Sequence, residues 1–258
     1  MTVTGERVTT PQGGFNPTWQ RHVAAYALCA DLLPPGRVLD VGCGVGHSYR
    51  RLGPRESVGL DVDARSLEGQ RRETVVADMR DVPFGDSAFA SVLAVQSIEH
   101  VPDPERMLAE VVRVLEPDGT AIFVTPNRHT FSPPNEIVDP YHWVEYDSGE
   151  LSALCSRFFG TVDLLGLFGS SRYLELVAEE RAKLEALLRR DPLRLRRAIP
   201  RAARQRLYDR RLTRERRAAD PRAAAITEQD FELRREGLGH ALDVVAVCHR
   251  PLRRAARP

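Results

Sequence analysis

A strand-like run over residues 37–41 leads into three glycines at alternate positions, and no other stretch offers clearer binding chemistry. Asp40 precedes Gly42, Gly44 and Gly46. Glycine lets the backbone turn tightly at positive φ and approach a ligand closely, and a helix beginning after the turn would present free N–H groups to an anion. The pattern predicts a nucleoside-binding turn, with a purely structural glycine turn as the alternative.

Spacing narrows the choice of ligand. A dinucleotide fingerprint that starts at Gly42 and Gly44 needs its third glycine at position 47, which is His47, so pyrophosphate binding is disfavoured. A second apolar run over 57–61 ends in Asp61, about twenty residues after Asp40, where this architecture requires a carboxylate for the two ribose hydroxyls. We therefore expect Asp61 to bind a ribose.

Further strand-like runs follow at regular intervals. One ends at Asp78, another over 89–95 ends at Gln96, and a fifth spans 120–125. Helical patterns alternate with these runs, which indicates an α/β fold with a parallel sheet covered by helices on both faces.

The glycine turn, the acidic strand ends and the sequence Gln-Ser-Ile-Glu-His-Val from Gln96 to Val101 resemble the class I S-adenosylmethionine-dependent methyltransferases, of the type 11 and type 25 small-molecule kind. The resemblance implies a Rossmann-like, seven-stranded, mostly parallel sheet with an antiparallel last strand. It also implies S-adenosyl-L-methionine as cofactor and S-adenosyl-L-homocysteine as product. One departure is Ala90, because the family commonly has an aspartate after the phenylalanine that opens the fourth strand.

By the same resemblance, Asp78 takes the adenine amino group, the backbone of Met79 lies beside the ring, and Gln96 contacts the methionyl end. Arg21 is expected to pair with the methionyl carboxylate, since its guanidinium offers a forked donor. The full set of expected cofactor contacts comprises Arg21, Asp40, Gly42, Cys43, Gly44, Gly46, Asp61, Val62, Asp78, Met79 and Gln96.

Motifs outside the cofactor half resemble bacterial saccharide O-methyltransferases, including those of methylglucose lipopolysaccharide biosynthesis. They are the segments 4–7, 19–22, 125–133, 139–146, 166–172 and 226–233. The resemblance implies methylation of a hydroxyl on a saccharide or a sugar-bearing small molecule. Two alternatives stay open: methylation of a non-sugar metabolite such as a polyketide, quinone precursor or fatty acid, and a non-catalytic cofactor-binding partner.

A sugar hydroxyl is a weak acid, so its methylation needs a base, and a histidine with a near-neutral pKa suits that role. His142 is the first candidate because it lies in an aromatic-rich segment, with Glu145 close enough in sequence to orient it. His100, beside Glu99, is the second candidate and His129 the third. No cluster has metal-ligand spacing, so no metal site is expected, and magnesium is neither supported nor excluded.

Between Arg172 and Arg222, seventeen basic residues face eight acidic ones, a net charge of +9 in a chain whose formal net charge is +1. We expect a methyltransferase domain over 1–170 and 226–258, interrupted before the last strand by an arginine-rich helical insertion over 171–225. The insertion could be a lid, an arm for homo-oligomerisation or a plain solvated surface; an anionic acceptor is a further interpretation. Nucleic acid is disfavoured because basic and aromatic residues do not interleave.

The amino-acid composition adds expectations about membrane spans, cysteines and the source of the protein. Hydrophobic residues make up 42% of the 258 residues, no apolar run is long enough to span a membrane, and four cysteines lack paired spacing. We expect reduced thiols and a cytoplasmic location. Lysine occurs once, at Lys183, against 36 arginines, which favours a bacterial source with a GC-rich genome.

Overall fold

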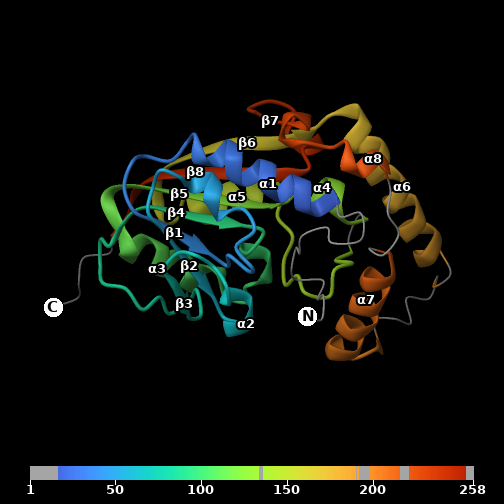
Figure 1. Cartoon of the computed structure of the whole chain (residues 1–258), viewed down its shortest axis with the longest axis horizontal. Coiled ribbons are helices and arrows are strands. Elements are labelled where there is room, and N and C mark those ends of the chain that lie inside the picture. Colours follow the sequence, from blue (N-terminus) through green and yellow to red (C-terminus); the bar gives the residue numbers. More distant parts are fainter. Residues whose placement is uncertain (1–16, 134–135, 190, 192–197, 216–220, 254–258) are drawn as a thin grey trace.

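The computed structural model describes residues 17–133, 136–189, 191, 198–215 and 221–253. Eight strands form one sheet in the order β3-β2-β1-β4-β5-β8-β6-β7 (Figure 1). Their bounds are Val38–Val41 (β1), Ser57–Asp61 (β2), Thr74–Val76 (β3), Phe89–Val95 (β4), Leu115–Pro126 (β5), Phe159–Gly169 (β6), Phe231–Arg234 (β7) and Asp243–Pro251 (β8).

The first five strands pair in parallel, whereas β8 lies antiparallel between β5 and β6. The predicted α/β fold with a mostly parallel sheet and an antiparallel last strand is thus confirmed. The sheet has eight strands where seven were expected. The extra strand, β7, pairs antiparallel with the outer edge of β6 and has only four residues, so its sequence alternation was too short to recognise.

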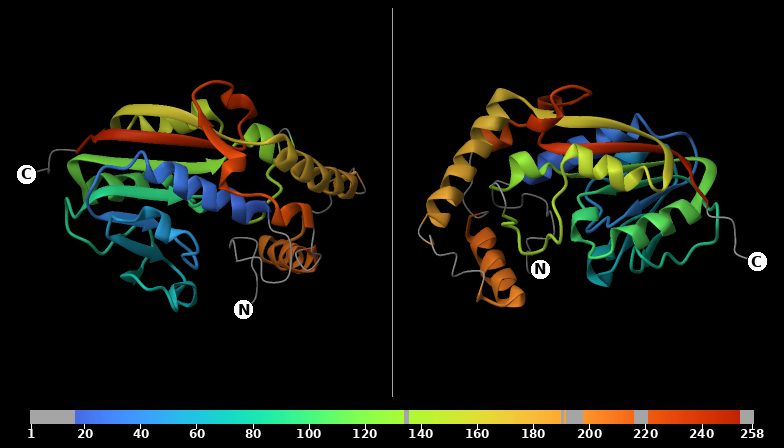
Figure 2. Two further views of the ribbon diagram at one scale, coloured as in Figure 1. Left: turned by 45° about the horizontal axis from the view of Figure 1, so that its top comes forward. Right: turned by 180° about the vertical axis from the view of Figure 1, so that it is seen from behind.

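Helices cover both faces of the sheet (Figure 2). They are Pro17–Ala30 (α1), Ala64–Leu67 (α2), Pro104–Val114 (α3), Arg128–Phe131 (α4), Ser148–Cys155 (α5), Ser171–Leu188 (α6), Arg201–Glu215 (α7) and Pro221–Ala224 (α8). Alternate residues of each central strand point into different cores, since Val92 and Phe123 pack with α3 and α5 while Leu93 and Ile122 pack with α1.

Local sequence explains where the helices begin. The Asp103 carboxylate accepts the Arg106 N–H at 3.2 Å at the start of α3, and Pro104 occupies its first turn. Asp147 and Glu150 form the capping box expected from the sequence at the start of α5.

The connection after the glycine turn differs from expectation. A single 3-10 turn, Tyr49–Leu52, stands where an α-helix was predicted. Ten residues separate Gly46 from β2, and Gly53-Pro54 interrupts them, which leaves no room for a regular helix. Anion binding by a helix N-terminus therefore does not apply at this turn.

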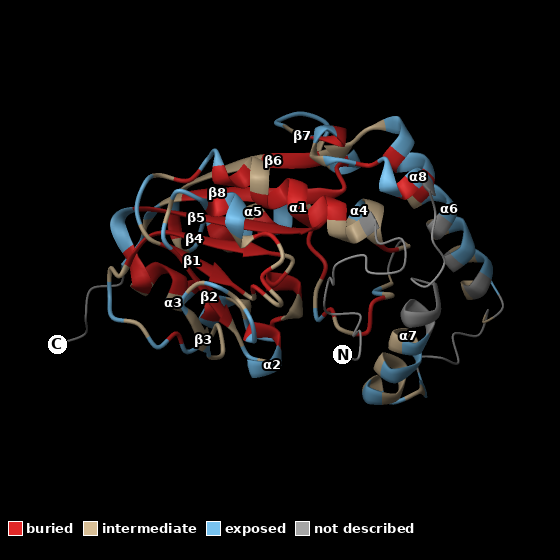
Figure 3. Ribbon diagram, in the orientation of Figure 1, coloured by how far each residue is buried: buried red, intermediate tan, exposed pale blue. Residues whose placement is uncertain are grey.

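The predicted insertion contains α6, α7 and α8, with residues 190, 192–197 and 216–220 outside the described residues. Figure 3 shows the strands largely buried, whereas α6 and α7 extend beyond the sheet and are mostly exposed or half-buried where burial is described. The motif at 4–7 also lies outside the described residues. No helix in the described ranges is long and apolar enough to cross a membrane.

Candidate active site

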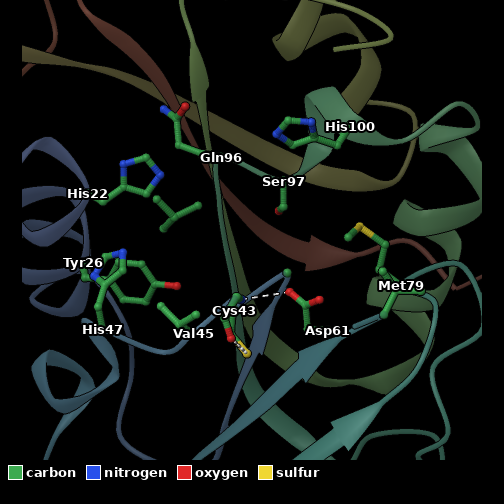
Figure 4. A pocket seen from close by; sticks show the side chains of 14 residues that line it. His22, Tyr26, Cys43, Val45, His47, Asp61, Met79, Gln96, Ser97 and His100 are labelled. Atoms are coloured by element: carbon green, nitrogen blue, oxygen red, sulfur yellow. Dashed lines mark hydrogen bonds between the residues drawn. The ribbon is translucent and has the colours of Figure 1, made fainter. Parts of the chain in front are cut away.

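A pocket opens at the carboxyl ends of β1, β2 and β4, and α1 forms one of its walls (Figure 4). The carboxyl ends of neighbouring parallel strands are where ligands of open α/β sheets bind. The pocket is lined by His22, Tyr26, Gly42, Cys43, Gly44, Val45, His47, Asp61, Val62, Met79, Val95, Gln96, Ser97 and His100.

Gly42 and Gly44 line this pocket, whereas Gly46 does not, and all three have positive φ angles, of +69° at Gly42, +53° at Gly44 and +65° at Gly46. Side chains are disfavoured at such angles. A Cβ atom at Gly42 would also lie 2.6 Å from the Ser97 Cβ, whereas no described atom lies within 4 Å of one at Gly44. The backbone at Gly44 is thus open to a ligand.

Asp61 stands at the end of β2, and backbone groups fix its carboxylate. Its Oδ2 accepts the Gly44 N–H at 2.9 Å and its Oδ1 accepts the Asp63 N–H at 2.9 Å. Figure 4 shows this side chain at the edge of the pocket, next to the glycine turn. A carboxylate held here is suited to accept hydrogen bonds from the hydroxyl groups of a ribose.

Asp40 is fully buried and does not line the pocket. Its carboxylate accepts the Tyr26 hydroxyl at 2.7 Å and the Arg72 guanidinium at 2.7 Å. Because Tyr26 belongs to α1, Asp40 joins that helix to the strand that carries the glycine turn. Its geometry is that of a support for the pocket.

The two residues expected around the adenine, Asp78 and Met79, differ in their position relative to the pocket. Met79 lines the pocket, whereas Asp78 does not. The Asp78 carboxylate accepts the Arg80 guanidinium at 2.6 Å, and this hydrogen bond lowers the Asp78 pKa. An adenine amino group would have to share that carboxylate with Arg80.

Gln96 ends β4 with a φ of +53° and lines the pocket. Its amide donates to Asp243 Oδ1 at 2.5 Å, and Arg21 Nε lies 3.1 Å from Asp243 Oδ2. Arg21 is only 7% exposed and does not line the pocket, so its guanidinium serves the buried Asp243 in this conformation. Arg21 is therefore connected to the pocket-lining Gln96 through Asp243.

His142 is placed as the sequence predicted, beside Glu145. Its Nδ1 lies 3.0 Å from Glu145 Oε1, which also accepts the Ser132 hydroxyl at 2.9 Å. Burial alone favours the neutral imidazole, but the hydrogen bond to Glu145 and the charge of Asp139 outweigh it and raise the His142 pKa. This pair has the geometry of a histidine oriented by a carboxylate.

His100 links His142 to the cofactor pocket, which it lines. The two imidazole rings lie 5.0 Å apart, centroid to centroid, at 70°. Burial, followed by the charge of His142, lowers the His100 pKa to about 3, so His100 is neutral. His129, the third candidate, is more than half exposed and lies 3.7 Å from Asp147, away from the pocket lining.

Six residues of the pocket lining were not predicted from the sequence: His22, Tyr26, Val45, His47, Val95 and Ser97. Burial keeps two of them neutral, since it lowers the pKa of His22 well below its usual value and that of His47 to about 4. His22 belongs to the motif over residues 19–22, so a signal for it was present in the sequence. His47 was noted only because it replaces the third glycine of a dinucleotide fingerprint. Their convergence depends on how α1 packs over the turn.

The insertion contacts the loop that carries His142. The Arg201 guanidinium donates to the backbone oxygens of Pro140 at 2.8 Å and Tyr141 at 3.0 Å, and it stacks 3.8 Å from the centre of the Trp143 ring. The Tyr208 hydroxyl donates to Asp139 Oδ2 at 3.0 Å. One face of α7 thus holds residues 139–143 in place.

Comparison with known proteins agrees with this geometry. Residues 39–123 match the family model described as "Methyltransferase domain". A Mycobacterium tuberculosis protein named "Probable S-adenosylmethionine-dependent methyltransferase" is 30% identical over 265 residues, covering 97% of this chain and 90% of the relative. A Mycolicibacterium smegmatis protein of the same description is 29% identical over 263 residues, covering 97% and 96%.

A solved structure from Thermotoga maritima, titled a "SAM-dependent methyltransferase, possible histamine N-methyltransferase", matches with a TM-score of 0.58. It covers 90% of both chains at 18% identity, which shows the fold alone.

Fold and pocket together define a Rossmann-like transferase that binds a nucleoside cofactor at the ends of its strands. With the full-length relatives, they show that the chain belongs to the S-adenosylmethionine-dependent methyltransferases. S-adenosylmethionine is therefore its cofactor, and the pocket residues fit that ligand: an open glycine backbone, a fixed carboxylate at Asp61 and a methionine side chain on the far wall.

Proposed function

We propose that the protein transfers the methyl group of S-adenosylmethionine to a hydroxyl of a saccharide or a sugar-bearing small molecule, with His142 as general base. The observation that carries this proposal is the His142–Glu145 pair, which adjoins the cofactor pocket through the neighbouring His100 ring. Such a base is needed for an alcohol and much less for a phenol or a carboxylic acid. The saccharide motifs of the sequence supply the acceptor class.

The sulfonium provides the electrophilic methyl and the leaving group, so the protein positions the hydroxyl in line and removes its proton. Glu145 holds the Nδ1 side of His142, and the other nitrogen, Nε2, is left to accept the proton. The imidazolium that forms is stabilised by Glu145, which is fully buried at its side chain. Glu145 is thus a positioning residue for His142.

In this proposal the nucleoside part of the cofactor is bound by Gly42, Gly44 and Asp61, and its methionyl end by Gln96. Arg21 and Asp243 fix Gln96 from below. The insertion is proposed as a lid, because α7 holds the loop of His142. Basic residues of α7 would favour an anionic acceptor. A cytoplasmic location and self-association through the insertion stay predictions from the sequence.

The test is transfer of an isotopically labelled methyl group to free, phosphorylated and nucleotide-linked sugars, to phenols and to hydroxy acids, with products resolved by mass. Label in a sugar supports the proposal. Label confined to phenols or acids overturns the saccharide acceptor, and saturable cofactor binding without transfer to any hydroxyl favours a non-catalytic partner.

The base is tested with His142→Ala, and His240→Ala serves as the control because His240 is an exposed histidine outside the pocket lining. We expect a turnover loss of about 10²–10⁴-fold for His142→Ala, the usual contribution of a general base. Affinity for S-adenosylhomocysteine should stay unchanged. Near wild-type turnover at neutral pH would contradict the role of His142.

A further inference from the structure

Three side chains beside the cofactor pocket, of which His100 lines it, converge in a way that proton transfer does not require. Glu99, His100 and His142 each offer one ligand atom, and these three atoms lie within 4.8 Å of one another. Glu99 and His100 belong to the turn that follows β4, whereas His142 comes from the loop after α4. Only folding brings the two segments together.

Each of the two imidazole rings is oriented by a contact of its Nδ1 atom. His142 Nδ1 lies 3.0 Å from Glu145 Oε1, and His100 Nδ1 lies 3.3 Å from the backbone oxygen of Tyr141. An acceptor on Nδ1 places the proton there and leaves the lone pair on Nε2. Metal-binding histidines have this arrangement, in which a carboxylate or carbonyl fixes the tautomer and the ring orientation.

Glu99 supplies an independent observation. Its side chain is fully buried, and Oε2 accepts the Thr125 hydroxyl at 3.0 Å, but Oε1 is buried with no hydrogen-bond partner among the described residues. A buried carboxylate oxygen without a partner is costly and calls for an explanation. A cation between Glu99 and the two histidines would satisfy this atom.

We propose that Glu99, His100 and His142 bind a divalent transition-metal ion as a two-histidine, one-carboxylate site. Imidazole nitrogens favour zinc, iron or nickel, whereas magnesium prefers oxygen ligands. Ligand atoms bound to zinc at about 2.0–2.1 Å lie closer together than the present three, so the side chains close around the ion. This site could not be predicted from residue spacing, because His142 lies about forty residues after His100.

The ion and the acceptor proton require the same lone pair on His142. Metal binding and general-base catalysis at this residue therefore exclude one another, and a bound ion inhibits methyl transfer. This consequence for activity rests on the proposed function, but the binding site itself does not.

The experiment uses the full chain after removal of metal with a chelator. Co²⁺ is titrated while its visible ligand-field absorption is recorded, and Zn²⁺ and Mg²⁺ are then tested as competitors. We expect one Co²⁺ per chain, displaced by Zn²⁺ and not by Mg²⁺. Glu99→Gln and His142→Ala should lose the Co²⁺ spectrum, Glu145→Gln should weaken binding about 10- to 100-fold as an outer-shell change does, and His240→Ala should bind normally.

Affinity for S-adenosylhomocysteine verifies that each variant is folded, since Glu99 and His142 do not line the cofactor pocket. Absence of Co²⁺ binding to the wild type, or equal binding by folded Glu99→Gln and His142→Ala, would overturn the site. In the activity arm, Zn²⁺ should lower turnover in proportion to occupancy, and stimulation would overturn the inhibitory role. Metal binding without any methyl transfer would contradict the proposed function alone.

Discussion

The Asp61 carboxylate is held in a fixed position by the backbone around it. Both of its oxygens are already occupied by backbone N–H groups, at 2.9 Å each, so the carboxylate is fixed before a ligand arrives. A fixed acceptor binds without the entropy cost of ordering a mobile one. Asp61 therefore holds the shape of the glycine turn and, in the proposed function, presents a fixed acceptor to the ribose.

Asp61→Asn should weaken binding of S-adenosylhomocysteine by roughly tenfold or more, since hydrogen bonds to a charged group contribute about 1.5–3 kcal/mol. Isothermal titration calorimetry measures this directly. Glu68→Gln, an amide substitution at an exposed acid nearby in sequence, is the control and should bind as the wild type does. Equal affinities of the two variants would show that Asp61 does not contact the ligand.

The sequence predicted the residues that line the pocket better than the buried residues that support them. Gly42, Gly44, Asp61, Met79 and Gln96 line it because they follow strands whose carboxyl ends meet at one edge. Arg21 and Asp40 lie behind the lining because their partners, Asp243 and Arg72, come from distant segments. Spacing along a chain identifies strand ends, but it does not identify a partner that tertiary packing brings in.

Among the elements, α7 has the clearest effect on the site, because it contacts the loop over residues 139–143 through Arg201 and Tyr208. Asp139 accepts the Tyr208 hydroxyl, and its Oδ2 lies 3.9 Å from His142 Nε2. The helix thus influences the proposed base through one intervening carboxylate.

Tyr208→Phe should lower kcat several-fold and leave the affinity for S-adenosylhomocysteine unchanged, because it frees Asp139 to move relative to His142. Misplacement of about an ångström is costly for proton transfer. Tyr49→Phe removes a hydroxyl outside this loop and is the control. Steady-state kinetics with the acceptor found in the labelling experiment gives the answer; a change confined to cofactor affinity would refute the positioning role.

The junction between β6 and α6 depends on Asp230, in the short turn Glu228–Asp230. Its carboxylate accepts the Ser170 hydroxyl at 2.6 Å, Arg172 Nη2 at 2.6 Å and the Thr227 N–H at 2.8 Å. The Arg172 hydrogen bond holds the Asp230 pKa well below its usual value. The ionised form is thereby favoured in the folded state.

A carboxyl group whose pKa is depressed by folding stabilises the protein above its unfolded pKa of about 3.9, and this contribution is lost as the pH falls through the folded value. Asp230→Asn should therefore lower the free energy of unfolding at pH 7 by about 1–3 kcal/mol. The difference from wild type should shrink below pH 4. Urea denaturation at both pH values measures it, with the exposed Glu232→Gln as a control of small effect. A difference independent of pH would contradict this account.

The helices and strands themselves were largely predictable. The strand ends at Asp61 and Gln96 predicted β2 and β4 close to their observed bounds, because buried parallel strands are short apolar runs. The partly exposed β3 was predicted from a run that ends at Asp78, but the strand ends at Val76. The edge strand β7 was not recognised, since a four-residue edge strand has half of its residues exposed to water. Sequence periodicity reports burial, and it fails where burial is slight.

The buried pair of Arg21 and Asp243 joins α1, the first described helix, to β8 inside the sheet. Both side chains are nearly inaccessible, and burial of Asp243 raises its pKa despite the nearby arginine. Breaking such a pair leaves one uncompensated charge inside the protein.

Arg21→Met should destabilise the protein by about 3–5 kcal/mol, whereas Arg21→Met combined with Asp243→Asn should recover part of that loss, because no lone buried charge remains. A double-mutant cycle on unfolding free energies, completed with Asp243→Asn alone, measures the coupling. Strict additivity of the two single changes would show that the pair does not interact.

The place of β8 has a consequence for synthesis. This strand follows all the others along the chain, but it lies between β5 and β6 and carries Asp243, the partner of Gln96 and Arg21. Chains fold while they leave the ribosome, from the N-terminus onward. The glycine turn and Asp61 emerge early, but Gln96 obtains its support only when β8 enters the gap. A nascent chain that has not yet added β8 therefore has the glycine turn but lacks the Asp243 contact that holds Gln96.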